Sequence, residues 1–284
     1  MTAIRKILAC VGEPESAPAT LALALTVAAK LQAHVEALHV RIDPASAVPL
    51  VGEGMSGAMI EEMLAVAETQ AAERAKRVRA QFDEACKLAG VSLSAIPAPG
   101  LSAHWSEEVG REEEVVATAG RLADLTIMAR PVADRDSSGL MSLNAALMES
   151  GRPMLLAPPS APQSVGTHVA VLWNGSAEAA RAVSAAMPFL LAAETVSVFS
   201  ARENASMVPE ELAGFLAWHG IKARVQTFAP GAQVGASLWS EIVNAGADLV
   251  VMGAYTHSRL RQLILGGVTR HVLQTATLPV LLSH

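Results

Sequence analysis

The segment VVMGAYTHSRLRQLILGGVTRHVLQTATLPVLLSH, from Val250 to His284, carries the clearest fold pattern in this chain. It carries two short apolar runs, Leu249–Met252 and Leu278–Leu282, with a helix-like stretch between them that follows the pair Gly266–Gly267. Short apolar runs that alternate with helices predict buried parallel strands joined by helical crossovers. A lone Gly253 follows the first run. Glycines at these places indicate either a phosphate cradle or tight packing turns, and the segment alone leaves both open.

The same pattern occurs earlier in the chain. DLTIMARP (Asp124–Pro131) parallels DLVVMGAY (Asp248–Tyr255), and SGRPMLLAP (Ser150–Pro158) parallels TATLPVLLS (Thr275–Ser283). A stretch rich in Pro, Ser and Gln, Ala157–Gly166, separates the copies and is typical of a linker. An internal repeat on this scale predicts two tandem domains, which we assign to residues 1–160 and 161–284.

Strand-like and helix-like segments alternate in both halves, which predicts an α/β fold. We expect two tandem doubly wound domains, each a five-stranded parallel sheet, packed as a pseudo-dimer through their last strands, whose edges would otherwise be exposed. In the first half the expected strands are 4–11, 33–41, 92–98, 125–129 and 154–157, and the expected helices are 18–31, 59–89, 106–122 and 143–149. The apolar face of the long helix 59–89 either packs on the sheet or forms a subunit contact.

Composition restricts the function classes. The net charge of −6 and the pI near 5.8 argue against a nucleic-acid partner. No apolar run reaches the roughly 18 residues that span a bilayer, so we expect no membrane partner. The N-terminus lacks the layout of a signal peptide, and Cys10 and Cys86 are too few for a disulfide framework. These features predict a cytoplasmic protein whose two cysteines are structural and unlinked.

The sequence contains no pattern that indicates a catalytic or metal site. GEGMSG (Gly52–Gly57) matches the dinucleotide fingerprint GxGxxG, but it does not follow a strand directly, so we interpret it as a loop. The eight histidines show no metal-site spacing, and no nucleophile-plus-base pattern is recognisable. The acidic run Glu107–Glu108 and Glu112–Glu114 is interpreted as a solvated helix face. The sequence therefore favours a binding protein over an enzyme.

Two α/β halves, each ending in strand, glycine loop, helix and proline-containing strand, resemble the universal stress protein family, strongly in 167–284 and weakly in 4–158. Nucleotide-binding members carry G-x2-G-x9-G-[ST] after the fourth strand. Against that motif Gly253 and Gly266 match, whereas Thr256 and Gly267 replace a glycine and a hydroxyl residue. The family's acidic residue after the first strand falls on Asn174. In the first half Gly12, Ala129 and Arg130-Pro131 replace the corresponding residues, so we expect its nucleotide site to be lost.

The resemblance implies a stress-response binding or regulatory protein with weak binding of ATP or AMP in the second half, and no metal beyond nucleotide-associated Mg²⁺. The expected cofactor-binding residues are Asn174, Met252, Gly253, Thr256, Gly266, Gly267, Val268 and Thr269. Self-association is a further expectation. Two alternatives remain open: a slow enzyme that cleaves ATP or another phosphate ester, and a scaffold whose ligand site is vestigial.

Overall fold

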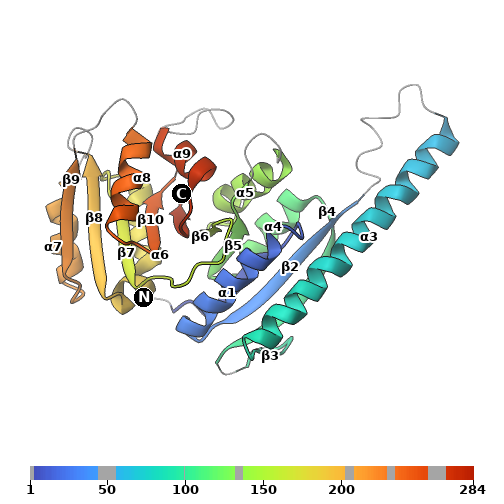
Figure 1. Cartoon of the computed structure of the whole chain (residues 1–284), viewed down its shortest axis with the longest axis horizontal. Coiled ribbons are helices and arrows are strands. Elements are labelled where there is room, and N and C mark those ends of the chain that lie inside the picture. Colours follow the sequence, from blue (N-terminus) through green and yellow to red (C-terminus); the bar gives the residue numbers. More distant parts are fainter. Residues whose placement is uncertain are drawn as a thin grey trace.

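The structure is a computed structural model that describes residues 3–43, 56–98, 100–131, 137–201, 208–228, 234–254 and 267–284. Its centre is one eleven-stranded sheet with the order β3-β4-β2-β1-β5-β6-β11-β10-β7-β8-β9 (Figure 1). All neighbouring strands pair in parallel except β6 and β11, which pair antiparallel. The predicted α/β class with mostly parallel sheet is therefore confirmed, and the two halves share a single sheet.

The first half supplies six strands and four of the described helices. The strands are β1 (Lys6–Cys10), β2 (His34–Ile42), β3 (Ser92–Leu93), β4 (Ser102–Gly110), β5 (Leu125–Ala129) and β6 (Met154–Ala157). The helices are α1 (Ala17–Leu31), α3 (Gly57–Leu88), α4 (Glu112–Gly120) and α5 (Ser137–Glu149).

The second half supplies five strands and four described helices, in the same order as the first half apart from the additional strand β3. The strands are β7 (His168–Leu172), β8 (Thr195–Ala201), β9 (Ala223–Phe228), β10 (Leu249–Gly253) and β11 (Val280–Ser283). The helices are α6 (Ala177–Ala192), α7 (Pro209–Ala217), α8 (Val234–Asn244) and α9 (Gly267–Thr275). No helix within the described ranges is long and apolar enough to cross a bilayer.

Two layers of helices cover the sheet because successive side chains of each strand point to opposite faces. On one face Ile7, Val169 and their neighbours pack under α1, α3, α6 and α7; on the other, Leu8, Ala170 and their neighbours pack under α4, α5, α8 and α9. Each apolar cluster includes residues of both halves, so the core continues across the middle of the sheet.

The halves join through their last strands. Met154, Leu155 and Leu156 of β6 lie opposite Leu282, Leu281 and Val280 of β11. This antiparallel pairing covers the two edges that the sequence predicted would need covering. The linker between β6 and β7 is also anchored, because the Lys30 ammonium group donates to the main-chain oxygens of Val165 (3.0 Å) and Gly166 (2.8 Å).

The repeated aspartates Asp124 and Asp248 have matching structural roles. The Asp124 carboxylate accepts the main-chain N–H groups of Arg5 and Lys6 at 2.8 and 3.0 Å. The Asp248 carboxylate likewise accepts those of Thr167 and His168, at 2.9 to 3.0 Å. Each carboxylate thus ties the start of its own strand to the start of the neighbouring strand, and the recurrence of Asp in both sequence copies follows from this bond.

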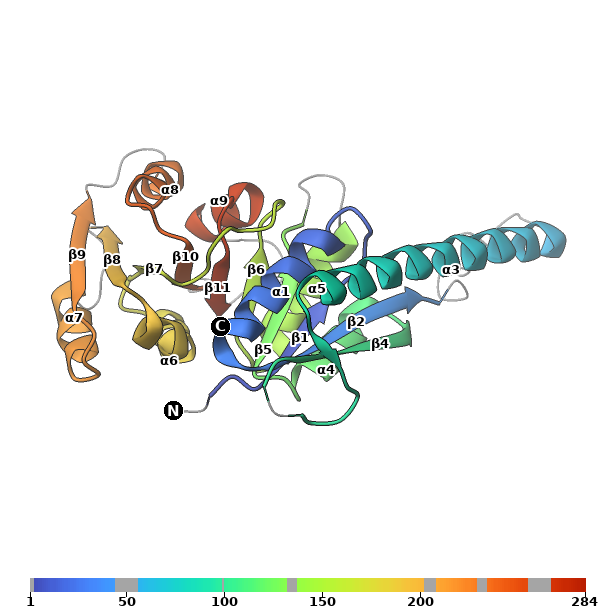
Figure 2. The ribbon, with the colours of Figure 1, turned by 60° about the horizontal axis from the view of Figure 1, so that its bottom comes forward.

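Helix α3 has two different parts. Its later part packs on the sheet and on α1 through Ala75, Val78, Phe82 and Cys86, which are buried. Its earlier part extends beyond the sheet (Figures 1 and 2), and there Met59, Met63 and Val66 are about half exposed at 53%, 48% and 51%. The interpretation of the apolar face as core packing therefore holds for the later part of the helix. The exposed apolar side chains of the earlier part are where a subunit contact can be tested.

One segment of the first half was predicted wrongly. The expected strand 92–98 is only the two-residue β3, and the third main strand is β4, whose last five residues were predicted to be helical. Glu107 and Glu108 therefore lie on a strand, where Glu107 accepts a hydrogen bond from Arg41 of β2 at 3.2 Å. Glu112, Glu113 and Glu114 do lie in a helix, in the first turn of α4, where their charge complements the helix dipole.

Candidate functional site

The candidate site lies at the carboxyl edge of the second half's strands. Strands β7 and β10 pair in parallel with Leu172 opposite Met252, so the two strands end side by side at the same edge of the sheet. The turn from β7 to α6 contains Asn174, and β10 ends at Gly253. Ligands of doubly wound α/β folds bind at this edge. The topology thus brings together two of the sequence-predicted residues that lie about eighty positions apart in the chain.

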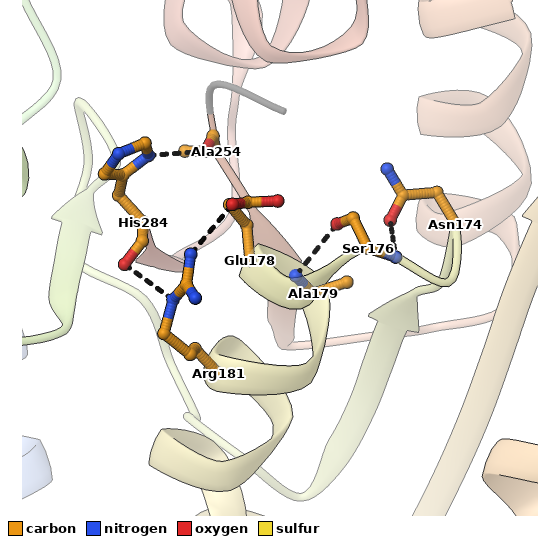
Figure 3. Close-up of polar contacts among 7 residues, drawn as sticks. All are labelled: Asn174, Ser176, Glu178, Ala179, Arg181, Ala254 and His284. Carbon is orange, nitrogen blue, oxygen red and sulfur yellow. Dashed lines mark hydrogen bonds and ion pairs between the residues drawn. The ribbon is translucent and has the colours of Figure 1, made fainter. Parts of the chain in front are cut away.

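Asn174 shapes the turn that begins α6. Its side-chain Oδ1 accepts the main-chain N–H of Ser176 at 3.1 Å, and the Ser176 hydroxyl accepts the N–H of Ala179 at 3.1 Å as the N-cap of the helix (Figure 3). The Asn174 side chain is exposed, and its amide nitrogen points away from the turn (Figure 3). The oxygen is therefore committed to the fold, and the outward-facing group is a hydrogen-bond donor.

Gly253 allows α6 to approach the end of β10. A Cβ on Gly253 would lie 2.5 Å from the main-chain nitrogen of Ala179 and 2.8 Å from the Cβ of Glu178. Both distances are shorter than any normal contact, so only glycine fits. The space that its missing side chain leaves is filled by α6. The packing interpretation of this glycine is supported, because Gly253 leaves the room that the first turn of α6 needs against the end of β10.

A polar cluster that the sequence did not predict lies beside Gly253. Arg181 donates to the Glu178 carboxylate at 2.8 Å and to the main-chain oxygen of His284 at 2.8 Å (Figure 3). The His284 ring lies 3.3 Å from the oxygen of Ala254. Partial burial raises the pKa of Glu178, but hydrogen bonds from its own N–H, Arg181 and Ser176 outweigh burial and hold that pKa below its ordinary value. No spacing in the sequence links Arg181 to His284, so only the fold reveals the cluster.

The remaining predicted residues differ in position and in burial. Gly267, Val268 and Thr269 form the first turn of α9, which starts at the carboxyl edge, as predicted. Met252 and Thr269 are buried, at 4% and 6% exposure, so their side chains serve the core. Thr256 and Gly266 lie outside the described residues. The described part of the site therefore offers the first-turn amides of α9 and the amide of Asn174.

The matching edge of the first half is built differently. A Cβ on Gly12, which corresponds to Asn174, would lie 3.3 Å from a carboxylate oxygen of Glu112. Ala129, which corresponds to Gly253, is followed by Arg130, whose guanidinium group reaches the main-chain oxygens of Leu273 and Gln274 in α9. This edge presents an acidic side chain and a contact with the other half where a phosphate cradle would need glycines.

Metal and thiol chemistry find no support in the described ranges. Within them, no three His, Cys, Asp or Glu side chains gather closely enough to hold a metal ion. Cys10 and Cys86 are unlinked and buried, in agreement with the prediction that they are structural. Burial, with the charges of Glu112 and Glu36, raises the pKa of Cys10, and burial raises the pKa of Cys86 to about 11. Both thiols are therefore protonated and poorly reactive at neutral pH.

Comparison with known proteins adds a family match for the second half. Residues 167–284 match the model of the Universal stress protein family. This is the part of the chain in which the sequence resemblance was expected to be strong. No curated protein sequence matches the chain.

Solved structures share the fold over nearly the whole chain. A universal stress protein from Archaeoglobus fulgidus DSM 4304 aligns with a TM-score of 0.64 at 16% identity, covering 98% of this chain and 95% of its own. A protein from Pseudomonas aeruginosa PAO1, described as functionally unknown, aligns with a TM-score of 0.56 at 15% identity, covering 99% and 92%. At such identities the likeness concerns the fold, and it extends through both halves.

Proposed function

We propose that this chain is a cytoplasmic stress-response protein of the universal stress type, which acts by binding and regulation, and that its second half binds ATP or AMP weakly. The observation that carries the proposal is the meeting of the Asn174 turn with the end of β10, in the half that matches the family model. The first turn of α9 belongs to the same edge. Its N–H groups have no acceptor within the helix, and they suit a phosphate group together with the positive end of the helix dipole.

Asn174 explains why the binding is weak. Because its oxygen already accepts the Ser176 N–H, only the amide N–H₂ faces outward, and this group cannot accept from the amino group of adenine or from a ribose hydroxyl. An aspartate at this position has a second oxygen, so one can hold the turn while the other accepts from the ligand. With Asn174, we expect affinity in the range of tens of micromolar or weaker.

The test uses titration calorimetry with ATP and AMP on wild type and on Asn174→Asp. We expect Asn174→Asp to tighten binding several-fold, since it restores one hydrogen bond of roughly 1 kcal/mol. Asn244→Asp is the matched control, because it makes the same charge change at an exposed position at the other end of the strands. Absence of binding by both wild type and Asn174→Asp would reject the nucleotide proposal.

That negative result would favour the second candidate, a scaffold with a vestigial ligand site. The observation in its favour is that α6 fills the space beside Gly253. Phosphate release measured in the same samples addresses the enzyme alternative. We expect none above background, and release that rises in proportion to protein concentration would favour the enzyme.

Self-association is the remaining part of the proposal. Its candidate surface is the extended part of α3, where Met59, Met63 and Val66 are exposed. Sedimentation velocity on wild type and on Met63→Glu tests it, with Leu122→Glu as a control at an exposed leucine near the end of α4. We expect only the α3 variant to shift the protein to the smaller species, and equal sedimentation of all three proteins would exclude this surface.

A further inference from the structure

Arg130 of the first half contacts α9, the helix whose first turn belongs to the candidate site of the second half. Arg130 directly follows β5, and its main-chain N–H donates to the oxygen of Ala157 at the end of β6, at 3.0 Å. Because β6 and β11 run antiparallel, the end of β6 lies beside the start of β11, and α9 ends just before β11. The fold therefore places Arg130 at the carboxyl end of α9.

The contact satisfies main-chain groups that the helix itself leaves open. The last four carbonyls of a helix have no partner within it. In α9 the oxygen of Val272 accepts the N–H of Ala276 at 2.9 Å, while the oxygens of Leu273 and Gln274 accept from the Arg130 guanidinium group. A cation at this end of a helix also meets the negative end of its dipole.

Arg130 makes this contact at a cost, which indicates a specific role. The side chain is half-buried, and burial lowers the pKa of the guanidinium group. Its Nε atom is buried and has no hydrogen-bond partner among the residues that the structure describes. Leaving a buried donor unpaired is unfavourable, so the bonds to α9 must offset that loss. The corresponding residue of the second half is Ala254, which has no side chain that can return the contact, so the anchoring is one-sided.

We propose that Arg130 is a positioning residue for α9: it fixes the far end of the helix whose first turn binds the nucleotide. The first half, which has lost its own glycine loop, thereby sets the affinity of the second half. The inference rests on the proposed nucleotide binding for its effect on affinity, and on the contact alone for its effect on α9.

Arg130→Ala removes the contact, and Arg152→Ala is the matched control. Arg152 is another first-half arginine that donates to a helix-end carbonyl, the oxygen of Arg121 after α4 at 3.3 Å, but it stays within its own half. Arg130→Lys keeps the charge with a different donor geometry and should lie between wild type and Arg130→Ala.

The first measurement is hydrogen exchange of the ligand-free full chain, with the amides of α9 compared with those of β7 and β10 in the same sample. We expect Arg130→Ala to raise exchange in α9 about tenfold relative to those strands, and Arg152→Ala to leave the ratio unchanged. The ratio separates local loosening from a general loss of stability. An unchanged ratio in Arg130→Ala would overturn the inference.

The second measurement is calorimetry with ATP on the same variants. We expect Arg130→Ala to weaken binding about tenfold and Arg152→Ala to leave it unchanged. Equal affinity of Arg130→Ala and wild type, with faster exchange in α9, would overturn the coupling to the ligand. If wild type binds no nucleotide, the proposed function fails by itself, and the exchange experiment still decides whether Arg130 anchors α9.

Discussion

Leu155 of β6 lies directly opposite Leu281 of β11, at the centre of the antiparallel pair that joins the two halves. Both side chains are fully buried in the apolar cluster that runs under α1 and α6. The two leucines form the middle pair of the three residue pairs between β6 and β11, so each half contributes one leucine to the centre of the junction.

Replacing Leu155 by alanine should destabilise both halves together. We expect the free energy of unfolding to fall by about 2–5 kcal/mol, because a buried leucine leaves a cavity when it is truncated. Urea denaturation followed by circular dichroism measures the loss. Leu191→Ala is the control, since that side chain is 54% exposed and its loss should change stability by no more than about 0.5 kcal/mol. Equal effects of the two variants would contradict the packing described for the junction.

Gly253→Ala should lower stability through one close contact. The added Cβ meets the main-chain nitrogen of Ala179 at 2.5 Å, so α6 must shift, at about 1–3 kcal/mol. Gly214→Ala in α7 is the matched control, because nothing lies within 4 Å of its added Cβ. There we expect a gain of about 0.5–1 kcal/mol from the better helix propensity of alanine. Thermal unfolding of both variants decides the point, and a neutral Gly253→Ala would show that α6 moves freely.

The two parts of α3 should respond differently to truncation. Phe82→Ala removes a fully buried ring that packs beside Trp105, and should cost about 3–5 kcal/mol. Met63→Ala removes a side chain that is 48% exposed, and should change stability by less than about 0.5 kcal/mol. Chemical denaturation of the two variants measures the difference. A large effect of Met63→Ala would mean that this part of the helix is packed in solution.

His34 should make stability depend on pH in a defined window. Partial burial, together with Lys6 and His104, lowers its pKa below the ordinary value of 6.5, although Glu36 opposes the shift. Between the two pKa values the unfolded chain binds more protons, so this contribution is complete above about pH 6.5 and is lost as the pH falls below that value. Urea denaturation at pH 7.5 and 5.5 should show a smaller loss on acidification in His34→Gln than in wild type. An equal loss in both proteins would contradict this assignment.

The sequence predicted strands well where burial on both faces makes them uniformly apolar. The expected ranges 125–129 and 154–157 coincide with β5 and β6, since central parallel strands consist of short apolar runs. It failed on β4, whose end carries Glu107, Glu108 and an exposed Val109. That strand lies near the edge of the sheet, where acidic side chains reach solvent, so its local pattern cannot be distinguished from that of a polar helix.

The candidate site was predictable only in part. Chain topology placed Asn174 and Gly253 at one edge, because Gly253 ends β10 and Asn174 lies in the turn after the parallel strand β7. The sequence could not show that α6 occupies the space beside Gly253, or that Arg130 reaches α9. Both contacts join segments far apart in the chain, and they depend on how helices pack over the finished sheet.

The short linker that Lys30 anchors has a consequence for assembly. Two separate chains that paired through ladders as small as β6–β11 would need high concentrations to remain together, and dilution would part them. Joining the halves through residues 158–166 makes their encounter intramolecular. Even a short flexible connection gives an effective concentration in the millimolar range, and the contacts of Lys30 restrain this one further. The pairing of the two halves is therefore independent of the protein's concentration, because each chain contains both partners.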